Sequence, residues 1–280
     1  MNDPIQLYDK TALDCSEKIT KNYSTSFSLG IRSLSRDIHK PIYAIYGFVR
    51  FADEIVDTFH HHDKETILSV FKKDTENAIR EKFSTNPVLH SFQIIVNKYN
   101  IDKELIDAFL KSMHMDISKT TFSASEYKEY IYGSAEVVGL MCLKVFCANE
   151  EKYIELKEYA LSLGSAFQKI NFLRDIQSDH EERGRVYFPS VDFHNFTDKD
   201  KESIEKDIKI DFDKALIGIK KLPKNAKGGV YLAYTYYIGL FNKIKNTPAS
   251  LLSKSRIRIS NFYKFILYLS SRVQLITGII

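Results

Sequence analysis

The chain has 280 residues, of which 40 are Lys or Arg and 36 are Asp or Glu, so its formal net charge is +4. Gly (11) and Pro (6) together fill about 6% of the positions, roughly half the usual share, which argues against a β-rich sandwich or barrel. The charge excess is too small and too dispersed to indicate a nucleic-acid-binding surface. The 17 Tyr and 19 Phe residues supply enough apolar area for a large core or for an elongated pocket.

The cysteines and the apolar stretches indicate the cellular compartment in which the protein works. Cys15, Cys142 and Cys147 form no CxxC pair and are odd in number, so the sequence predicts neither a disulfide framework nor a zinc site. Residues 1–10 lack a basic segment followed by an apolar run, as in a signal peptide. No apolar stretch reaches the roughly 18 residues that cross a membrane. We therefore expect a cytoplasmic protein whose membrane contact, if any, is peripheral.

Apolar residues recur with the helical period along most of the chain, which predicts an all-α fold. We expect a single domain over residues 1–280, built around one large core. Ser123 with Glu126 forms a capping box that predicts a helix start, and Glu182–Asn195 is expected to be a loop. The expected helices are Thr11–Lys21, Arg36–Phe59, Lys64–Phe83, Pro87–Tyr99, Lys103–Ser118, Ala124–Cys147, Glu151–Ser178, Lys199–Lys221, Ala226–Lys245 and Ser260–Leu275.

A first polar stripe lies on the second of these helices. Tyr46, Arg50, Asp53 and Asp57 follow one another at steps of four, three and four residues, which places them on one helix face. The remaining positions are apolar nearly all the way round, as in a buried helix. Two carboxylates four residues apart repel one another, and burying them unpaired would cost far more. The pattern therefore predicts a cation beside them.

A second stripe repeats this arrangement. Gln168, Asn171, Asp175 and Asp179 recur at steps of three, four and four residues on another aliphatic helix. One acidic pair of this spacing usually marks a solvated face, but two pairs on buried helices favour two stripes that face each other across a cavity. Such hard oxygen ligands suit Mg²⁺, with Mn²⁺ as an alternative, because these ions complete their coordination with water and phosphate oxygens. The sequence therefore predicts chemistry on a diphosphate.

These motifs resemble those of a known family. DEIVD (Asp53–Asp57) and NFLRDIQSD (Asn171–Asp179), the latter followed by RGRVYFP (Arg183–Pro189), are similar to the two aspartate-rich motifs of the squalene and phytoene synthase family. Supporting matches are YSTSFSLG (Tyr23–Gly30) and EYIYGSAEVVGLM (Glu129–Met141). The ordered set is far more specific than a lone DxxxD, and YGSAEVVGLM and RGRVYFP look most like bacterial phytoene synthases.

The resemblance implies a fold and a reaction. The fold is the all-α isoprenoid-synthase (terpenoid synthase) bundle, with a central cavity between the helices that carry the aspartate pairs. The reaction is that of a prenyltransferase: two geranylgeranyl diphosphates condense head to head, through prephytoene diphosphate, to phytoene and two diphosphates, in carotenoid biosynthesis. Because the route ends by proton loss without hydride transfer, no NADPH is expected. The chain accordingly lacks a GxGxxG dinucleotide signature.

The resemblance also implies roles for individual residues. Tyr130 matches the tyrosine that assists proton loss or stabilises cationic intermediates, and Arg50 matches a diphosphate-binding arginine. The chain departs from the family pattern at Glu136, where glycine is common, and at Tyr23, where some members have histidine. The aspartates are expected to act in catalysis as well as in metal binding. The implied metal ligands are Asp53, Asp57, Asn171, Asp175 and Asp179, and the other implied substrate-binding residues are Tyr46, Gln168, Arg174, Arg183, Tyr236 and Arg256.

Other functions remain open at this point. The same chemistry on farnesyl diphosphate would make squalene or dehydrosqualene. A non-catalytic helical scaffold could instead use its acidic stripes to bind a basic partner. A terpene cyclase or chain elongase fits less well, because elongases usually carry DDxxD twice. The basic residues Lys254, Arg256 and Arg258 beside the apolar C-terminal helix indicate either contact with anionic lipid or an exposed basic turn. The pattern favours no particular oligomeric state.

Overall fold

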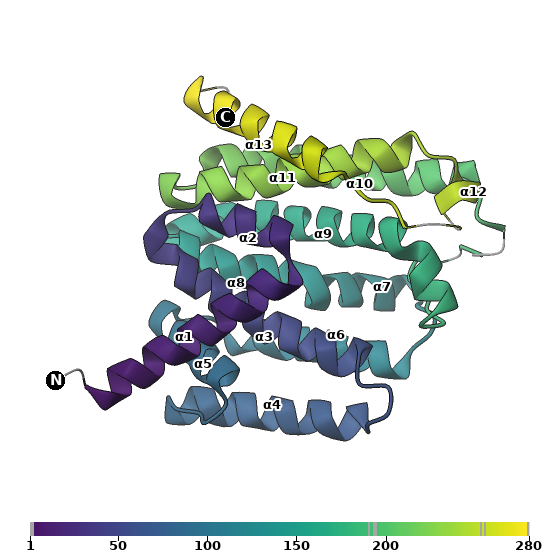
Figure 1. Cartoon of the computed structure of the whole chain (residues 1–280). Helices are drawn as coiled ribbons and strands as arrows, with labels where there is room; N and C mark the ends of the chain where they lie inside the picture. Colours follow the sequence, from purple (N-terminus) through teal and green to yellow (C-terminus); the bar gives the residue numbers. More distant parts are fainter. Residues whose placement is uncertain (1–2, 190, 193–194, 253, 255, 279) are drawn as a thin grey trace.

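A computed structural model describes residues 3–189, 191–192, 195–252, 254, 256–278 and 280. The all-α prediction is confirmed: within these residues the only strand-like feature is an isolated bridge between Thr121 and Val186. Figure 1 shows the helices stacked from α4 at the bottom of the view to α13 at the top. The α-helices are α1 (Pro4–Tyr23), α2 (Thr25–Arg32), α3 (His39–Asp57), α4 (Lys64–Glu81), α5 (Pro87–Tyr99), α6 (Lys103–Ser118), α7 (Ala124–Ile131), α8 (Val137–Phe146), α9 (Glu150–Glu181), α10 (Asp198–Lys221), α11 (Lys224–Lys245), α12 (Ala249–Leu252) and α13 (Asn261–Ile276).

The N-terminal part differs from the sequence-based expectation. Helix α1 begins at Pro4 rather than at Thr11, because the Asp3 side chain caps it and proline suits the first turn. Helix α2 was not predicted, since eight residues are too few for a clear periodic pattern. Ser24 caps this helix by accepting a hydrogen bond from the Phe27 backbone N–H. The expected helix from Arg36 divides into a 3₁₀ turn, η1 (Arg36–Ile38), and α3.

The expected helix over 124–147 is helical without a break from 124 to 146, but it is not a regular α-helix throughout. A five-residue π-helical turn, η2 (Tyr132–Glu136), separates α7 from α8. Glycines allow the neighbouring helices to approach this turn closely. A Cβ atom on Gly133 would lie 2.5 Å from the Ala108 carbonyl oxygen of α6, and one on Gly164 of α9 would lie 2.9 Å from the Ala135 carbonyl oxygen. The turn is therefore held between α6 and α9. The predicted capping box at Ser123 is confirmed.

Helix α9, 32 residues long, runs through the middle of the bundle between α8 and α10 (Figure 1). Its first half packs into one cluster of buried apolar side chains through Tyr153 and Leu156, and its second half packs into another through Ile170 and Leu173. The expected loop over 182–195 contains no α-helix among its described residues. In the described part of the chain, no helix combines the length and the apolar character that crossing a membrane requires.

Candidate active site

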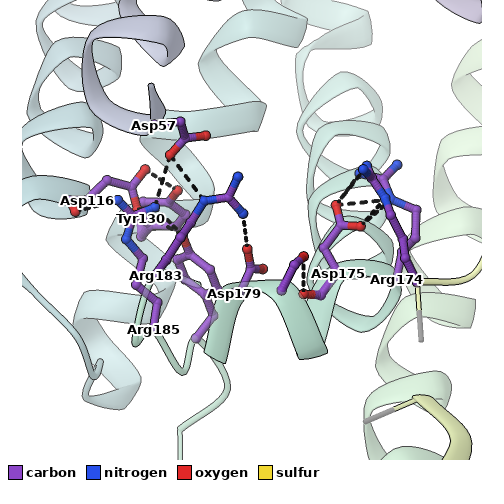
Figure 2. A network of polar contacts seen from close by, with 11 residues as sticks. Asp57, Asp116, Tyr130, Arg174, Asp175, Asp179, Arg183 and Arg185 are labelled. Atoms are coloured by element: carbon purple, nitrogen blue, oxygen red, sulfur yellow. Dashed lines mark hydrogen bonds and ion pairs between the residues drawn. The ribbon is translucent and has the colours of Figure 1, made fainter. Parts of the chain in front are cut away.

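Arg183 joins the two acidic stripes. Its Nη1 donates to Asp179 Oδ1 at 2.7 Å, and its Nε lies 3.6 Å from Asp57 Oδ1. Asp57 ends α3, Asp179 lies near the end of α9, and Arg183 belongs to the loop that follows α9. Figure 2 shows the guanidinium group between the two carboxylates. The fold thus brings one aspartate of each predicted pair to the same cation.

A second arginine from the same loop extends this network. Arg185 Nη1 lies 3.3 Å from Asp57 Oδ1 and 3.4 Å from Asp116 Oδ1, and Nη2 donates to the Asp116 carbonyl oxygen at 2.7 Å. The Asp116 carboxylate also accepts hydrogen bonds from the hydroxyls of Tyr130, at 2.6 Å, and Tyr187, at 2.9 Å. The Tyr130 hydroxyl, expected to serve the reaction, is therefore engaged with a buried acid.

Sequence reasoning missed Asp116. It lies on the buried face of α6, three residues after Met113 and seven after Phe109, so an acid on an apolar stripe was the available signal. Tyr187 was missed as well, and so was Glu54, which pairs with Arg50. We use the name "charged region" for the charged residues that these contacts connect, together with Asp53 and Asp175. Its members are Asp53, Asp57, Asp116, Asp175, Asp179, Arg183 and Arg185.

Two carboxylates of the charged region, those of Asp116 and Asp179, are buried, and the other three are partly exposed. Burial raises the pKa of Asp53 to about 7; Arg50 opposes this shift, whereas Asp57 adds to it. Burial also raises the pKa of Asp116 and of Asp179 to about 6 each, against the influence of Arg185 and Arg183 respectively. The arginines thus offset only part of the effect of burial on these pKa values.

This donor set fits a divalent cation by its chemistry. The carboxylates of the charged region, together with the Asn171 amide, offer the hard oxygens that Mg²⁺ prefers. Among the described residues, however, no three His, Cys, Asp or Glu side chains are grouped closely enough to hold a metal ion. Arg183 and Arg185 lie between the acids, so the arrangement is one of ion pairs.

Asp175 pairs with different arginines from its neighbour Asp179. Arg174 Nε donates to Asp175 Oδ1 at 3.0 Å, and Arg256 Nε lies 2.7 Å from the same atom. Figure 2 shows the Arg174 contact well to one side of Arg183. One helical turn before Asp175, Asn171 Oδ1 accepts from the Tyr237 hydroxyl at 3.1 Å, and Asn171 Nδ2 donates to Gln168 Oε1 at 3.3 Å.

Two predicted substrate-binding residues have buried polar atoms that lack a hydrogen-bond partner among the described residues: Arg50 Nε and the Tyr236 hydroxyl. Arg50 also pairs with Glu54 and lies with its guanidinium carbon 4.4 Å from the centre of the Tyr23 ring. Tyr46 packs against Phe27, with ring centres 4.6 Å apart. A buried donor without a partner is rare in native proteins, so these two atoms are available to donate to a ligand.

A cavity of about 770 Å³ lies beside the charged region. It follows α9 from Leu156 to Arg174, which at 1.5 Å per residue is about 27 Å. One end is polar and the other is apolar. The polar end is lined by Gln168, Asn171, Arg174, Tyr236 and Arg256, and the apolar end by Cys142, Leu143, Phe146, Leu156 and Ala160.

The expected position of the cavity needs correction. Among the described residues that line it, neither the four motif aspartates nor Tyr130 is present. The physical reason is that Arg183 and Arg185 fill the space between the acidic stripes, so the cavity opens along the neighbouring side of α9. Glu136 does not line it either; burial raises the pKa of Glu136 to about 7, and Asp211 adds to the shift.

Comparison with known proteins identifies the family. The helical bundle has the isoprenoid-synthase fold: it superimposes on a crystal structure of a dehydrosqualene synthase in complex with ligand with a TM-score of 0.82 at 21% identity, covering 98% of this chain and 100% of that one. The sequence profile of the squalene/phytoene synthase family matches residues 20–263. The chain therefore belongs to the squalene/phytoene synthase family, whose members are transferases that condense prenyl diphosphates.

The relatives of this chain include both a diapophytoene synthase and a phytoene synthase. The chain is 26% identical over 276 residues to 4,4'-diapophytoene synthase of Staphylococcus haemolyticus (strain JCSC1435), covering 90% of this chain and 93% of that protein. It is equally 26% identical over 279 residues to chloroplastic phytoene synthase 1 of Solanum lycopersicum, covering 90% of this chain and 66% of that longer protein.

Proposed function

We propose that this protein condenses two geranylgeranyl diphosphates head to head, through prephytoene diphosphate, to phytoene and two diphosphate ions. The observation that carries this proposal is the elongated cavity, which has arginines and amides at one end and apolar walls along the rest. An anionic head group and a long hydrocarbon tail are the two parts of a prenyl diphosphate, and the cavity offers each of them a matching environment.

The polar end supplies donors for a diphosphate. Arg174 and Arg256 line it, and a guanidinium group presents a planar fork that suits phosphate oxygens. In the described structure both arginines pair with Asp175, so the anion would share them with that carboxylate. The Tyr236 hydroxyl is buried there without a partner, and a phosphate oxygen would accept its hydrogen bond.

The motif residues are the proposed metal site. Asp53, Asp57, Asn171, Asp175 and Asp179 would hold Mg²⁺, or Mn²⁺ in its place, and a bound ion of this kind neutralises the departing diphosphate. The chain's own contribution is to keep these acids in place: Arg183 contacts Asp57 and Asp179 together, and Arg185 holds Asp57 against α6.

The apolar walls protect the carbocation that forms when the diphosphate leaves. Phe27, Phe167 and Tyr237 line the cavity, and a desolvated aromatic face contributes about 0.5–2 kcal/mol of cation–π attraction. Burial raises the pKa of Tyr130 well above its ordinary value, and Asp116 adds to the shift. Tyr130 therefore remains a neutral phenol, and its hydroxyl donates to Asp116 behind the cavity wall.

The length of the cavity accommodates the longer substrate. A residue of an extended polypeptide has three main-chain bonds and advances at most 3.3–3.6 Å. By the same measure, a geranylgeranyl chain of about sixteen main-chain carbons spans roughly 17 Å and a farnesyl chain roughly 13 Å. The wall that α9 contributes between Leu156 and Arg174 is longer than either chain. A C20 tail with its head group at Asn171 would end near Ala160.

Condensation of farnesyl diphosphate to dehydrosqualene is the second candidate. It is favoured by the nearly full-length match to a 4,4'-diapophytoene synthase and by the fold shared with a dehydrosqualene synthase. Incubation of the purified protein with Mg²⁺ and each prenyl diphosphate separately distinguishes the two, with chromatography of the hydrocarbon product. We expect phytoene from the C20 substrate. A C30 product from farnesyl diphosphate, with none from the C20 substrate, would contradict the phytoene proposal.

A further inference from the structure

Helix α13 presents a continuous apolar stripe to the outside. Phe262, Phe265, Leu269, Val273 and Ile276 recur at helical spacing and are 47% to 80% exposed, so they share one face. We call these five residues the α13 stripe. The opposite side of the helix packs on α11, where Leu267 approaches Gly239 and Leu275 approaches Gly228. Figure 1 shows α13 on the outer edge of the bundle, beyond α11.

The stripe is unusual for this molecule. In the described part of the chain, α13 carries seven of the nineteen large hydrophobic residues that are exposed, although it is only 16 residues long. Elsewhere such residues occur mostly apart from one another, for example Val70 on α4, Ile154 on α9 and Ile210 on α10. Single exposed apolar residues are normal, whereas a contiguous patch marks an interaction surface.

The charge of the surrounding sequence indicates what the stripe contacts. Residues 214–280 contain twelve lysines and arginines and no aspartate or glutamate, whereas residues 1–213 hold all 36 acids and only 28 basic residues. Lys254 and Arg258 precede α13, and Arg272 lies on it; all three are exposed. None of them forms an ion pair with another described residue. A basic, acid-free segment beside an apolar helix face suits an anionic lipid surface, where each cation near the surface contributes about 1 kcal/mol.

The stripe adjoins the cavity. The segment before α13 contributes Arg256, Ile257, Arg258 and Ile259 to the cavity wall, and α13 itself contributes Asn261 and Lys264. Phe262 and Phe265 are the next residues along the chain from these two lining residues. The helix that carries the stripe therefore also forms part of the cavity wall.

We infer that the α13 stripe docks the protein onto an anionic lipid bilayer, with α13 lying in the plane of the interface, so that hydrocarbon passes between the cavity and the membrane. The passage of hydrocarbon rests on the proposed function, whereas the docking itself does not. An amphipathic helix that lies in the interface binds through its buried apolar area together with attraction to anionic lipid. The stripe supplies the apolar area, and the acid-free segment supplies the charge.

The test is flotation of the purified full-length protein with two kinds of vesicle: phosphatidylcholine alone, and phosphatidylcholine with one fifth phosphatidylglycerol. We expect binding to the anionic vesicles that falls at high salt. The triple variant Phe262→Ser, Phe265→Ser, Leu269→Ser should bind at least tenfold more weakly. The matched control, Val70→Ser, Ile154→Ser, Ile210→Ser, removes exposed apolar residues elsewhere and should bind like the unmodified protein. Circular dichroism checks that all three proteins keep their helices.

Two results would overturn the docking surface. One is equal binding of the stripe variant and the unmodified protein to anionic vesicles. The other is a dimer, measured by light scattering, that dissociates in the stripe variant while neither protein floats with vesicles, since the stripe would then join two copies of the chain. Condensation activity is measured separately in detergent solution, where the stripe variant should match the unmodified protein. A protein that floats with anionic vesicles but condenses no prenyl diphosphate supports the docking surface and contradicts the proposed function.

Discussion

Between Leu156 and Phe167, the side of α9 that lines the cavity carries small and apolar residues, whereas between Gln168 and Asp179 the same helix carries amides, carboxylates and an arginine. The first stretch also packs on neighbouring helices, with Ala160 beside Gly139 of α8 and Tyr159 beside Gly218 of α10. The second contacts arginines from the loop after α9 and from the segment before α13. One continuous helix therefore fixes the spacing between the proposed places for the tail and for the head group, and substitutions in the two stretches should have different consequences.

The largest effect is expected in the charged region. Asp57→Ala removes the contact of α3 with both Arg183 and Arg185 and one proposed metal ligand. Because electrostatic stabilisation of a leaving group contributes several kcal/mol, we expect kcat to fall about 10³-fold or more. The measurement is steady-state hydrocarbon formation. Asp74→Ala, which removes an exposed acid on α4, should leave kcat unchanged; retention of a tenth of the activity by Asp57→Ala would exclude the proposed role.

A smaller loss is expected at the polar end of the cavity. Arg256→Ala removes one diphosphate donor but leaves Arg174 in contact with Asp175. We expect kcat/KM to fall about 10–100-fold, since a charge-assisted hydrogen bond contributes about 1.5–3 kcal/mol. The loss should be the same for C15 and C20 substrates, because the head group is common to both. Arg80→Ala, at an exposed arginine of α4, is the matched control. A loss confined to one chain length would place Arg256 at the tail instead.

Chain-length selectivity should change at the apolar end. Ala160→Phe adds a ring to the cavity wall about 16 Å from Asn171, eleven residues along α9. We expect kcat/KM for geranylgeranyl diphosphate to fall at least tenfold, while the value for farnesyl diphosphate changes less than threefold. Competition between the two substrates, with C30 and C40 products quantified together, measures this directly. Ile154→Phe, at an exposed position of α9, is the control. Equal losses for both substrates would contradict the proposed position of the tail.

The smallest effect is expected at a half-buried acid outside the charged region. The pKa of Glu136 is raised from 4.5 to about 7 in the folded protein. The folded state therefore holds more protons than the unfolded chain between pH 4.5 and about 7, and stability falls as the pH rises through this window. Glu136→Gln should flatten this decline and raise the melting temperature at pH 8 by about 2 °C, equivalent to about 1 kcal/mol after allowance for partial exposure.

Thermal unfolding followed across pH measures this difference. Glu202→Gln, at an exposed position of α10, should leave the pH dependence as it is. We expect kcat of Glu136→Gln to stay within twofold of the unmodified protein, because the charged groups that influence Glu136 are Asp211, Lys169, Glu158 and Lys214, all outside the charged region. A large loss of activity would show that the charged region extends further along α9 than its contacts indicate.

The helices and the two acidic stripes were predictable because both depend on residues close together in the sequence. The spacing of Asp175 and Asp179 places them on one side of α9 in any helix. The pairing of these residues was not predictable in the same way. Arg185 and Asp57 are 128 residues apart, and nothing in the period of either segment specifies that a loop arginine would occupy the space between the stripes. The cavity was consequently expected between the aspartates, whereas it lies beside them.

The interruption of the α-helix at residues 132–136 was also not predictable from the apolar pattern. The apolar period continues through residues 124–147, yet the backbone adds a π-helical turn at 132–136. That turn depends on close approach by α6 and α9 at Gly133 and Gly164, which is a property of three helices together. An apolar C-terminal helix was predicted, but which side faces α11 and which side faces outward required the packing at Gly228 and Gly239.

The π-helical turn has a consequence for insertions and deletions. An α-helix rotates by about 100° per residue, and a π turn accommodates one additional residue without breaking the helix. Deletion of one residue from η2 would allow α7 and α8 to join as a regular helix, but it would rotate them by that angle relative to each other. Tyr130 could then meet Asp116 only if Cys142 and Phe146 turned away from the cavity. The number of residues in this turn therefore sets the angle, about the helix axis, between Tyr130 and the residues of α8 that line the cavity.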